Sequence, residues 1–118
     1  MPARFARRSR CTTGDDVRRV KRDSIHVESV NILRALGFSV YDAAHAGDSF
    51  PDVCVGMAGI TDLIEFKTGN APLTDGQVVF AERWRGRPVV VLRSVVAVRE
   101  WALKQCHERR HGDVRPNG

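Results

Sequence analysis

An aspartate, a glutamate and a lysine in the middle of the chain form the pattern with the clearest chemical potential. Asp52 follows Phe50-Pro51, and Glu65 and Lys67 come thirteen and fifteen positions later. Adjacent carboxylates are the ligands that hard divalent cations such as Mg²⁺ and Mn²⁺ prefer. A lysine beside them can orient or deprotonate water, because buried lysines shift their pKa readily. Together these residue types predict metal-assisted hydrolysis.

The spacing between Asp52 and Glu65 predicts that they face each other across a β-hairpin. A two-residue turn at Ala58-Gly59 pairs the two residues directly. Directly opposed residues project to the same side of a sheet with Cβ atoms roughly 4.5–5.5 Å apart, and Lys67, two positions after Glu65, points to that side as well. A four-residue turn would pair Asp52 with Leu63 instead, and the Ala-Gly sequence does not decide between the two turns.

Two opposed carboxylates repel each other, so the predicted arrangement needs compensation. At ~4 Å and an effective dielectric constant near 20, the repulsion costs about 4 kcal/mol. A proton shared by the two acids, a salt bridge to Lys67 or a bound cation would each offset this cost.

The elements that position these residues follow from the apolar periodicity and the stop signals. The three central strands can pair antiparallel, and the last strand, reached through a helix, is expected to join the sheet in parallel. We therefore predict an α/β (α+β) fold, a mixed four-stranded sheet flanked by helices. The expected elements are a helix from Asp15 or Asp23 to residue 36, strands 38–41, 52–57 and 60–67, a helix over 73–84 capped by Thr74, a strand over 89–92 and a final helix capped by Ser94.

Charge and composition narrow the class of protein. The 118 residues carry a net charge of +5, but residues 1–22 alone carry +6 and residues 23–98 carry −3. We predict a disordered basic arm over 1–14 and a single domain over 15–118. The arm suits a polyanion such as nucleic acid, although a solubilising arm has the same composition. No apolar run reaches the ~20 residues of a membrane span, and three scattered cysteines favour a reducing cytoplasm, bacterial or that of a phage host.

The pattern Phe50-Pro51-Asp52 … Glu65-Phe66-Lys67, within the expected element order αβββαβ, resembles the PD-(D/E)XK nuclease superfamily over about residues 22–98. Residues 22–23 before a Glu-bearing helix, and residues 73–77 after the lysine, resemble small phage-type members related to virus-type replication-repair nucleases and Holliday-junction resolvases. The resemblance implies a restriction-endonuclease-like core with an extra C-terminal helix. It also implies a metal-dependent endodeoxyribonuclease that cuts branched or junction DNA in phage or mobile-element replication, recombination or repair. Many relatives act as homodimers, which suggests a second copy of this chain as a partner.

The resemblance also implies roles for individual residues. Asp52, Glu65 and the backbone carbonyl of Phe66 would hold Mg²⁺ or Mn²⁺, and Lys67 would position the attacking water. A further metal ligand would come from the first helix, where Glu28 is the match. Glu28 also lies at the edge of that helix's apolar stripe, where a carboxylate needs a partner. A salt bridge to a nearby basic residue such as Lys21 would satisfy it equally.

Several polar residues have competing interpretations. Gln77 follows Thr74 at the spacing of a capping box, whereas the resemblance places a glutamine near the catalytic lysine. Asp48 is interpreted as solvated loop, and Asp62 as structural because it alternates away from Glu65. The pair His107 and His111 is interpreted as part of a solvated helix, Asp23 as a cap, and neither His26 nor His45 belongs to a nucleophile constellation.

We expect DNA to be held by its phosphates, because no base-reading element is evident. The candidate contacts are the arm together with Lys21, Arg22, Arg83, Arg85 and Arg87. Two other functions compete with a nuclease: a non-catalytic DNA-binding module that retains the fold, and a phage or mobile-element assembly protein with an acidic interface.

Overall fold

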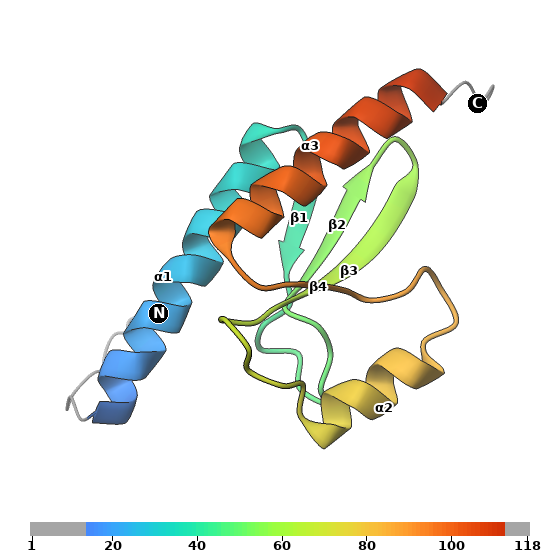
Figure 1. Cartoon of the computed structure of the whole chain (residues 1–118). Coiled ribbons are helices and arrows are strands. Elements are labelled where there is room, and N and C mark those ends of the chain that lie inside the picture. The colour runs from blue at the N-terminus through green and yellow to red at the C-terminus, as the bar shows by residue number, and fades with distance from the viewer. Residues whose placement is uncertain (1–13, 113–118) are drawn as a thin grey trace, which may run out of the picture.

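A mixed sheet with three helices is the architecture of the computed structural model, which describes the backbone of residues 14–112 and the side chains of 25–109. The predicted α+β class is confirmed, and the predicted arm over 1–14 lies, except for Gly14, outside the described residues. The elements are α1 (Gly14–Ala35), β1 (Ser39–Asp42), β2 (Val53–Met57), β3 (Ile60–Phe66), α2 (Asp75–Arg83), β4 (Val90–Leu92) and α3 (Val95–Gly112) (Figure 1).

The strands lie in the order β1-β2-β3-β4, with the first three antiparallel and β4 parallel to β3. The β2–β3 pairing runs from Met57↔Ile60 to Val53↔Ile64, so the two-residue turn is right and the four-residue alternative is wrong. Ala58 and Gly59 both have positive φ, 54° and 78°. Positive φ at both central residues defines the turn whose twist matches a hairpin.

A glycine ends α1 and turns the chain into β1. Gly37 has φ +100°, its N–H donates to the carbonyl of Arg34, and the N–H of Phe38 donates to that of Leu33, each at 3.0 Å. This pair of bonds is the Schellman motif, which favours glycine because a Cβ disfavours positive φ. The predicted stop at this position is therefore present.

The core lies where α1 and α3 pack on each other and on one face of the sheet, as Figure 1 shows. Its buried side chains come from every element except α2 and β1, together with Phe38 in the α1–β1 connection: Val30, Leu33, Phe38, Val53, Val55, Ile64, Leu92, Val98 and Ala102.

Helix α2 stands apart from this core. It lies at the end of the sheet away from the β2–β3 turn (Figure 1), and none of its residues is buried. No helix in the described part of the chain is long and apolar enough to cross a membrane.

Candidate active site

A cavity of about 350 Å³ gathers most of the residues that the sequence pattern singled out. Asp52, Glu65, Lys67 and Gln77 all line it. The two acids and the amine therefore share one pocket, as the hairpin register requires. The other lining residues are Ile25, His26, Ala44, Phe66, Thr68 and Ala71.

Asp52 lies one residue before β2 and is held there by two hydrogen bonds. Its Oδ2 accepts the backbone N–H of Phe66 at 2.8 Å, and its carbonyl accepts the N–H of Ala43 at 2.8 Å. Pro51 before it is buried. One carboxylate oxygen is therefore anchored to the adjacent strand, and this bond fixes where the other oxygen lies.

Glu65 is the electrostatically unusual group of the cavity. Its side chain sits on β3 with only 5% of the residue exposed. Burial, and secondarily the nearby charge of Asp52, raise the pKa of Glu65 to about 7, although Lys67 acts in the opposite direction. A single lysine thus compensates the two acids only in part, and Glu65 is about half protonated near neutral pH.

Gln77 links α2 to this acid. Its Oε1 accepts the N–H of Thr74 at 2.9 Å and its own N–H donates to Thr74 Oγ1 at 3.1 Å, which is a complete capping box. Its Nε2 also donates to Glu65 Oε2 at 2.9 Å. The two competing interpretations of Gln77 therefore hold together, because the amide uses its oxygen for the cap and its nitrogen for the site.

Lys67 follows β3 directly, and its backbone N–H donates to the carbonyl of Leu92 at 3.0 Å. The loop after it is tied down by Arg93, whose Nη1 donates to the carbonyls of Gly69 and Ala71 at 3.1 and 2.6 Å. Because Ala71 lines the cavity, Arg93 secures one of its walls.

His26 is a cavity residue that sequence reasoning did not select. Its Nε2 lies 3.0 Å from Asp42 Oδ2, and its ring meets the edge of Phe66 at 5.3 Å. Burial alone would raise the pKa of Asp42, but the Ala44 N–H and the His26 ring hold that pKa below its usual value. The signal for His26 was its helical spacing from Ser29 and Leu33, which the structure buries.

Glu28 is not brought to this cavity. It is exposed, and it is absent from the residues that line the pocket. The inward face of α1 runs through Ser29, Val30 and Leu33, and one turn earlier this face presents His26. Since successive helical residues are about 100° apart, Glu28 points away from the side that His26 occupies.

Asp62, three residues before Glu65, belongs to a separate cluster. It is 1% exposed and pairs with Val55 as the two-residue turn requires. Arg109 Nη2 lies 2.6 Å from its Oδ2, and Arg87 Nε lies 2.7 Å from its Oδ1. The interpretation of Asp62 as structural agrees with these contacts.

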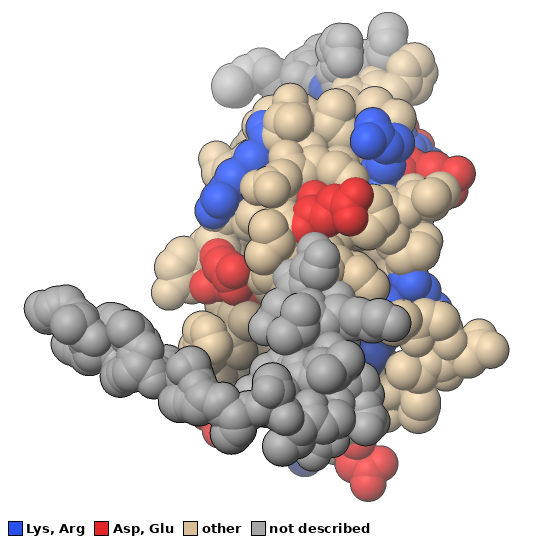
Figure 2. All heavy atoms as spheres, turned by 90° about the vertical axis from the view of Figure 1, so that its left-hand side faces the viewer, with Lys and Arg blue, Asp and Glu red and all other residues tan. Residues whose placement is uncertain are grey.

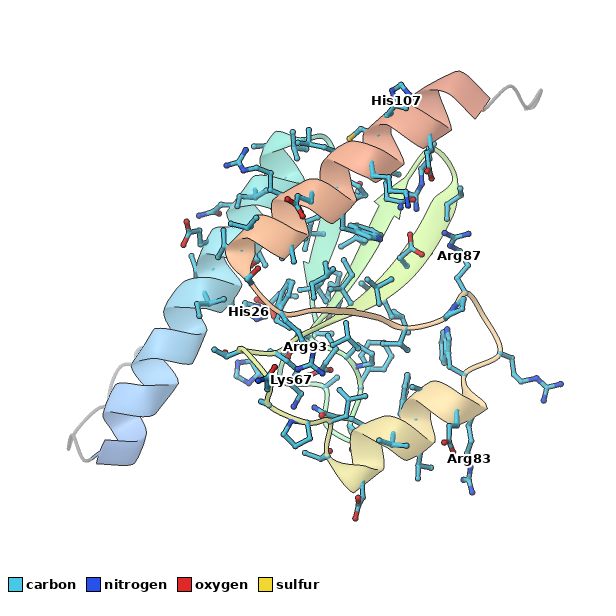
Figure 3. The ribbon with its side chains drawn as sticks, in the orientation of Figure 1. His26, Lys67, Arg83, Arg87, Arg93 and His107 are labelled. Carbon is cyan, nitrogen blue, oxygen red and sulfur yellow. The ribbon has the colours of Figure 1, made fainter. Side chains whose placement is uncertain are left out.

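The predicted DNA-contacting arginines are spread out. Arg83 and Arg85 are exposed, and Arg83 projects from the far end of α2, well away from Lys67 and His26 (Figure 3). Arg87 forms an ion pair with Asp62, and about half of its side chain is exposed. The side chains of Lys21 and Arg22 lie outside the described residues.

The two remaining candidate ligand groups also lie elsewhere. Asp48 is exposed and lines a different groove. His107 lies on α3, far from Lys67 (Figure 3), and the side chain of His111 is outside the described residues. Among the described residues, no three His, Cys, Asp or Glu side chains are grouped so that they could hold a metal ion.

A smaller set of oxygen donors does suit a hard cation. Asp52 and Glu65 supply two carboxylates in one cavity, and Phe66 between Glu65 and Lys67 also lines it. Mg²⁺ is usually held by one or two carboxylates and keeps several waters. Burial, and after it the charge of Asp52, raise the pKa of Glu65, and a bound cation would oppose both effects by favouring the ionised acid. Comparisons with protein-family models, with curated proteins and with solved structures found no match to this chain.

Proposed function

We propose that the protein is a divalent-metal-dependent endodeoxyribonuclease whose active site is the cavity around Asp52, Glu65 and Lys67. The observation that carries the proposal is the presence of two carboxylates and an amine in one pocket, with the pKa of Glu65 raised to about 7. Buried acids that are left uncompensated are characteristic of functional sites. The element order also agrees with the nuclease resemblance, as do the positions of Asp52 directly before β2 and of Glu65 and Lys67 at the end of β3.

Asp52, Glu65 and the Phe66 carbonyl would hold Mg²⁺ or Mn²⁺. When bound, the ion supplies charge neutralisation at the scissile phosphate and a lower pKa for the attacking water. Asp52 is oriented for this role by the Phe66 N–H, and Glu65 by the Gln77 amide. Lys67, which lines the same pocket, would orient the attacking water. As the water oxygen bonds to phosphorus and the bond to the 3′ oxygen breaks, the proton of the water would reach the 3′ oxygen by way of solvent.

DNA would be bound through its phosphates. Figure 2 views the molecule from the left-hand side of Figure 1. On the visible part of this face, Lys and Arg side chains are interspersed with Asp and Glu rather than gathered in one patch. Arg83, the last residue of α2, and Arg85 after it are exposed and available for such contacts. Because backbone contacts carry such binding, we expect affinity to weaken steeply with salt. We also expect the protein to select DNA by its branched or junction structure rather than by its sequence.

The test is a cleavage assay on Holliday-junction, flap, splayed and linear duplex DNA with Mg²⁺ or Mn²⁺. Wild type is expected to cut at least one branched substrate, and Lys67→Ala and Asp52→Asn are expected to be inactive. Lys104→Ala is the matched control, because Lys104 is exposed on α3 and its ion pair with Glu108 is long, at 4.0 Å. All variants are purified identically, so a contaminating nuclease would appear equally in each.

Binding without cleavage would overturn the proposal. A protein that retains branched DNA yet cuts nothing with either ion is a non-catalytic DNA-binding module, the second function that the sequence allows. Equal activity in wild type and Lys67→Ala would remove the cavity from the mechanism.

A further inference from the structure

A second groove, of about 640 Å³, lies between α2 and the loop that precedes Phe50. It shares no lining residue with the candidate active site. The two are nevertheless connected, because Gln77 reaches Glu65 from the helix that forms the groove. The lining residues are Asp48, Ser49, Asp75, Gly76, Val79, Phe80, Arg83 and Trp84.

The wall of this groove is a small aromatic cluster open to solvent. Phe80 and Trp84 are stacked at 5.3 Å with an interplanar angle of 15°, and Phe50 meets both rings edge-on at 5.4 and 6.5 Å. Trp84 is 41% exposed and Val79 43%. Exposed aromatic rings held in place by other rings are suited to stacking on a flat partner.

The charges around the groove are of two kinds. Arg83 lines it and Arg85 follows Trp84, both are exposed, and neither forms an ion pair with another described residue. Asp48 and Asp75 also line it. Carboxylates accept hydrogen bonds from amino groups and repel phosphate, whereas guanidinium groups attract phosphate. A nucleotide fits this set of charges with its base inside the groove and its phosphate toward the arginines.

The groove is built from the segment that also positions Asp52. Gly47, Asp48 and Ser49 have φ of 82°, 55° and 62°, and a Cβ at Gly76 would clash with Ser49 Oγ. The loop and the start of α2 therefore fit closely, and Phe50-Pro51 leads from the loop directly to Asp52. The groove and the candidate active site therefore share one continuous segment of the chain.

We propose that this groove, in the nuclease inferred above, binds an unpaired nucleobase of the DNA substrate by stacking it against Trp84. The groove would then select DNA with unpaired nucleotides next to the cleavage site. Stacking on aromatic side chains is tolerant of base identity, which agrees with the expectation that this protein does not select DNA by its sequence.

The test measures binding without cleavage, so that it is independent of the proposed chemistry. Affinity is measured in EDTA for a short oligothymidylate, for a duplex with a single unpaired base, for the same duplex with an abasic nucleotide at that position, and for a blunt duplex. Trp84→Ala and Val79→Asp alter the groove. Tyr41→Ala is the matched control, because Tyr41 is an aromatic residue 71% exposed on β1.

Trp84→Ala is expected to weaken binding of the oligothymidylate and of the duplex with the unpaired base by roughly ten- to a hundredfold. The affinity for the blunt duplex is expected to change less than about twofold on Trp84→Ala. Tyr41→Ala is expected to change the affinity for every DNA by less than about twofold. Removing the base is expected to weaken binding to wild type by a similar factor and to add little in Trp84→Ala, because both changes remove one stacking contact. Val79→Asp, at an exposed position, is expected to act in the same direction if Trp84→Ala does not fold.

Three results would overturn the inference. Equal binding of the abasic and base-containing duplexes by wild type would show that no base is recognised. If Trp84→Ala weakened binding of the blunt duplex as much as binding of the duplex with the unpaired base, Trp84 would act by stabilising the fold and not by stacking on a base. A concentration-dependent dimer that Val79→Asp dissociates would assign the groove to contact between two copies of this chain. Base-dependent binding by a protein that never cuts would retain the inference and remove only the nuclease proposal.

Discussion

Asp62 and Glu65 are two buried carboxylates on one strand, three residues apart. Neighbouring cations compensate the charge of Asp62 much more fully than that of Glu65. Asp62 has an arginine at 2.6 Å and another at 2.7 Å. Glu65 has the Gln77 amide at 2.9 Å and a second acid close enough to raise its pKa. The difference in compensation separates an acid that holds the fold together from one that remains available for a ligand.

The two positions explain this difference. Asp62 shares the side of β3 that carries Ile64 toward the helices, where Arg109 of α3 arrives with only 7% of the residue exposed. Glu65 alternates to the other side, where a cavity is present. Leaving a buried charge unpaired is costly, so this arrangement implies a benefit beyond stability.

The largest expected effect is on catalysis. Lys67→Ala is expected to lower cleavage by about 10²- to 10⁴-fold, the usual contribution of a side chain positioned at the reacting water, while the thermal unfolding curve stays close to that of wild type. The measurement is single-turnover cleavage with Mg²⁺, together with Lys104→Ala. If Lys67→Ala lost activity because it unfolds, Lys67 would have a structural role like that of Asp62, and the catalytic role would be contradicted.

Asp62→Ala is expected to reduce the free energy of unfolding by about 3–5 kcal/mol, because it leaves the buried Arg109 guanidinium unpaired. Urea unfolding measures the effect. Glu100→Ala, at an exposed position on α3, serves as the comparison and is expected to stay within about 0.5 kcal/mol of wild type. A loss for Asp62→Ala as small as that of Glu100→Ala would contradict a structural role.

The pH dependence of the free energy of unfolding is expected to reveal the raised pKa of Glu65. Its pKa rises from 4.5 to about 7 on folding, so between these values the folded state binds more protons than the unfolded state. The associated stabilisation is complete below about pH 4.5 and is lost as the pH rises through 7, a change of about 3 kcal/mol. Glu65→Gln removes this titration, so its stability relative to wild type should increase by that amount from pH 4.5 to pH 8. A constant difference across that range would contradict the raised pKa.

Divalent cations are expected to reverse this loss at high pH. At pH 8, Mg²⁺ or Mn²⁺ at ten to a hundred times its dissociation constant is expected to stabilise wild type by about 1.4–2.7 kcal/mol. Asp52→Asn is expected to gain much less, because it removes one of the two carboxylates. Thermal unfolding with and without the metal, at constant ionic strength, measures both; an equal gain in the two proteins would indicate nonspecific ion binding.

The two arginines of the structural cluster provide the smallest test. Arg87 has 52% of its side chain exposed, whereas Arg109 has 6%, and solvent screens the exposed pair. Arg87→Ala is therefore expected to cost about 1 kcal/mol of unfolding free energy, less than Arg109→Ala. The reverse order in urea unfolding would show that exposure does not govern this cluster.

The order of elements was predictable from the sequence alone, and the hairpin register was predicted as one of two alternatives. Apolar periodicity and local stop signals act over a few residues, which is why Gly37, the Ala58-Gly59 turn and the Thr74–Gln77 capping box could be recognised individually. Once the turn length is known, alternation along β3 places Glu65 and Asp62 on opposite sides. The pairing of Asp52 with Glu65 depended on that turn length, which the Ala-Gly sequence left open.

Only the tertiary structure decided which residues from distant segments join these groups. It brought His26 of α1 to the cavity and left Glu28 exposed, because the rotation of a helix about its axis is set by packing over its whole length. It also committed Arg87 to Asp62 and brought Arg109 from α3, 47 positions along the chain, to the same acid. Contacts between distant segments depend on how elements pack together, whereas a strand's alternation and a turn's length are local properties of the chain.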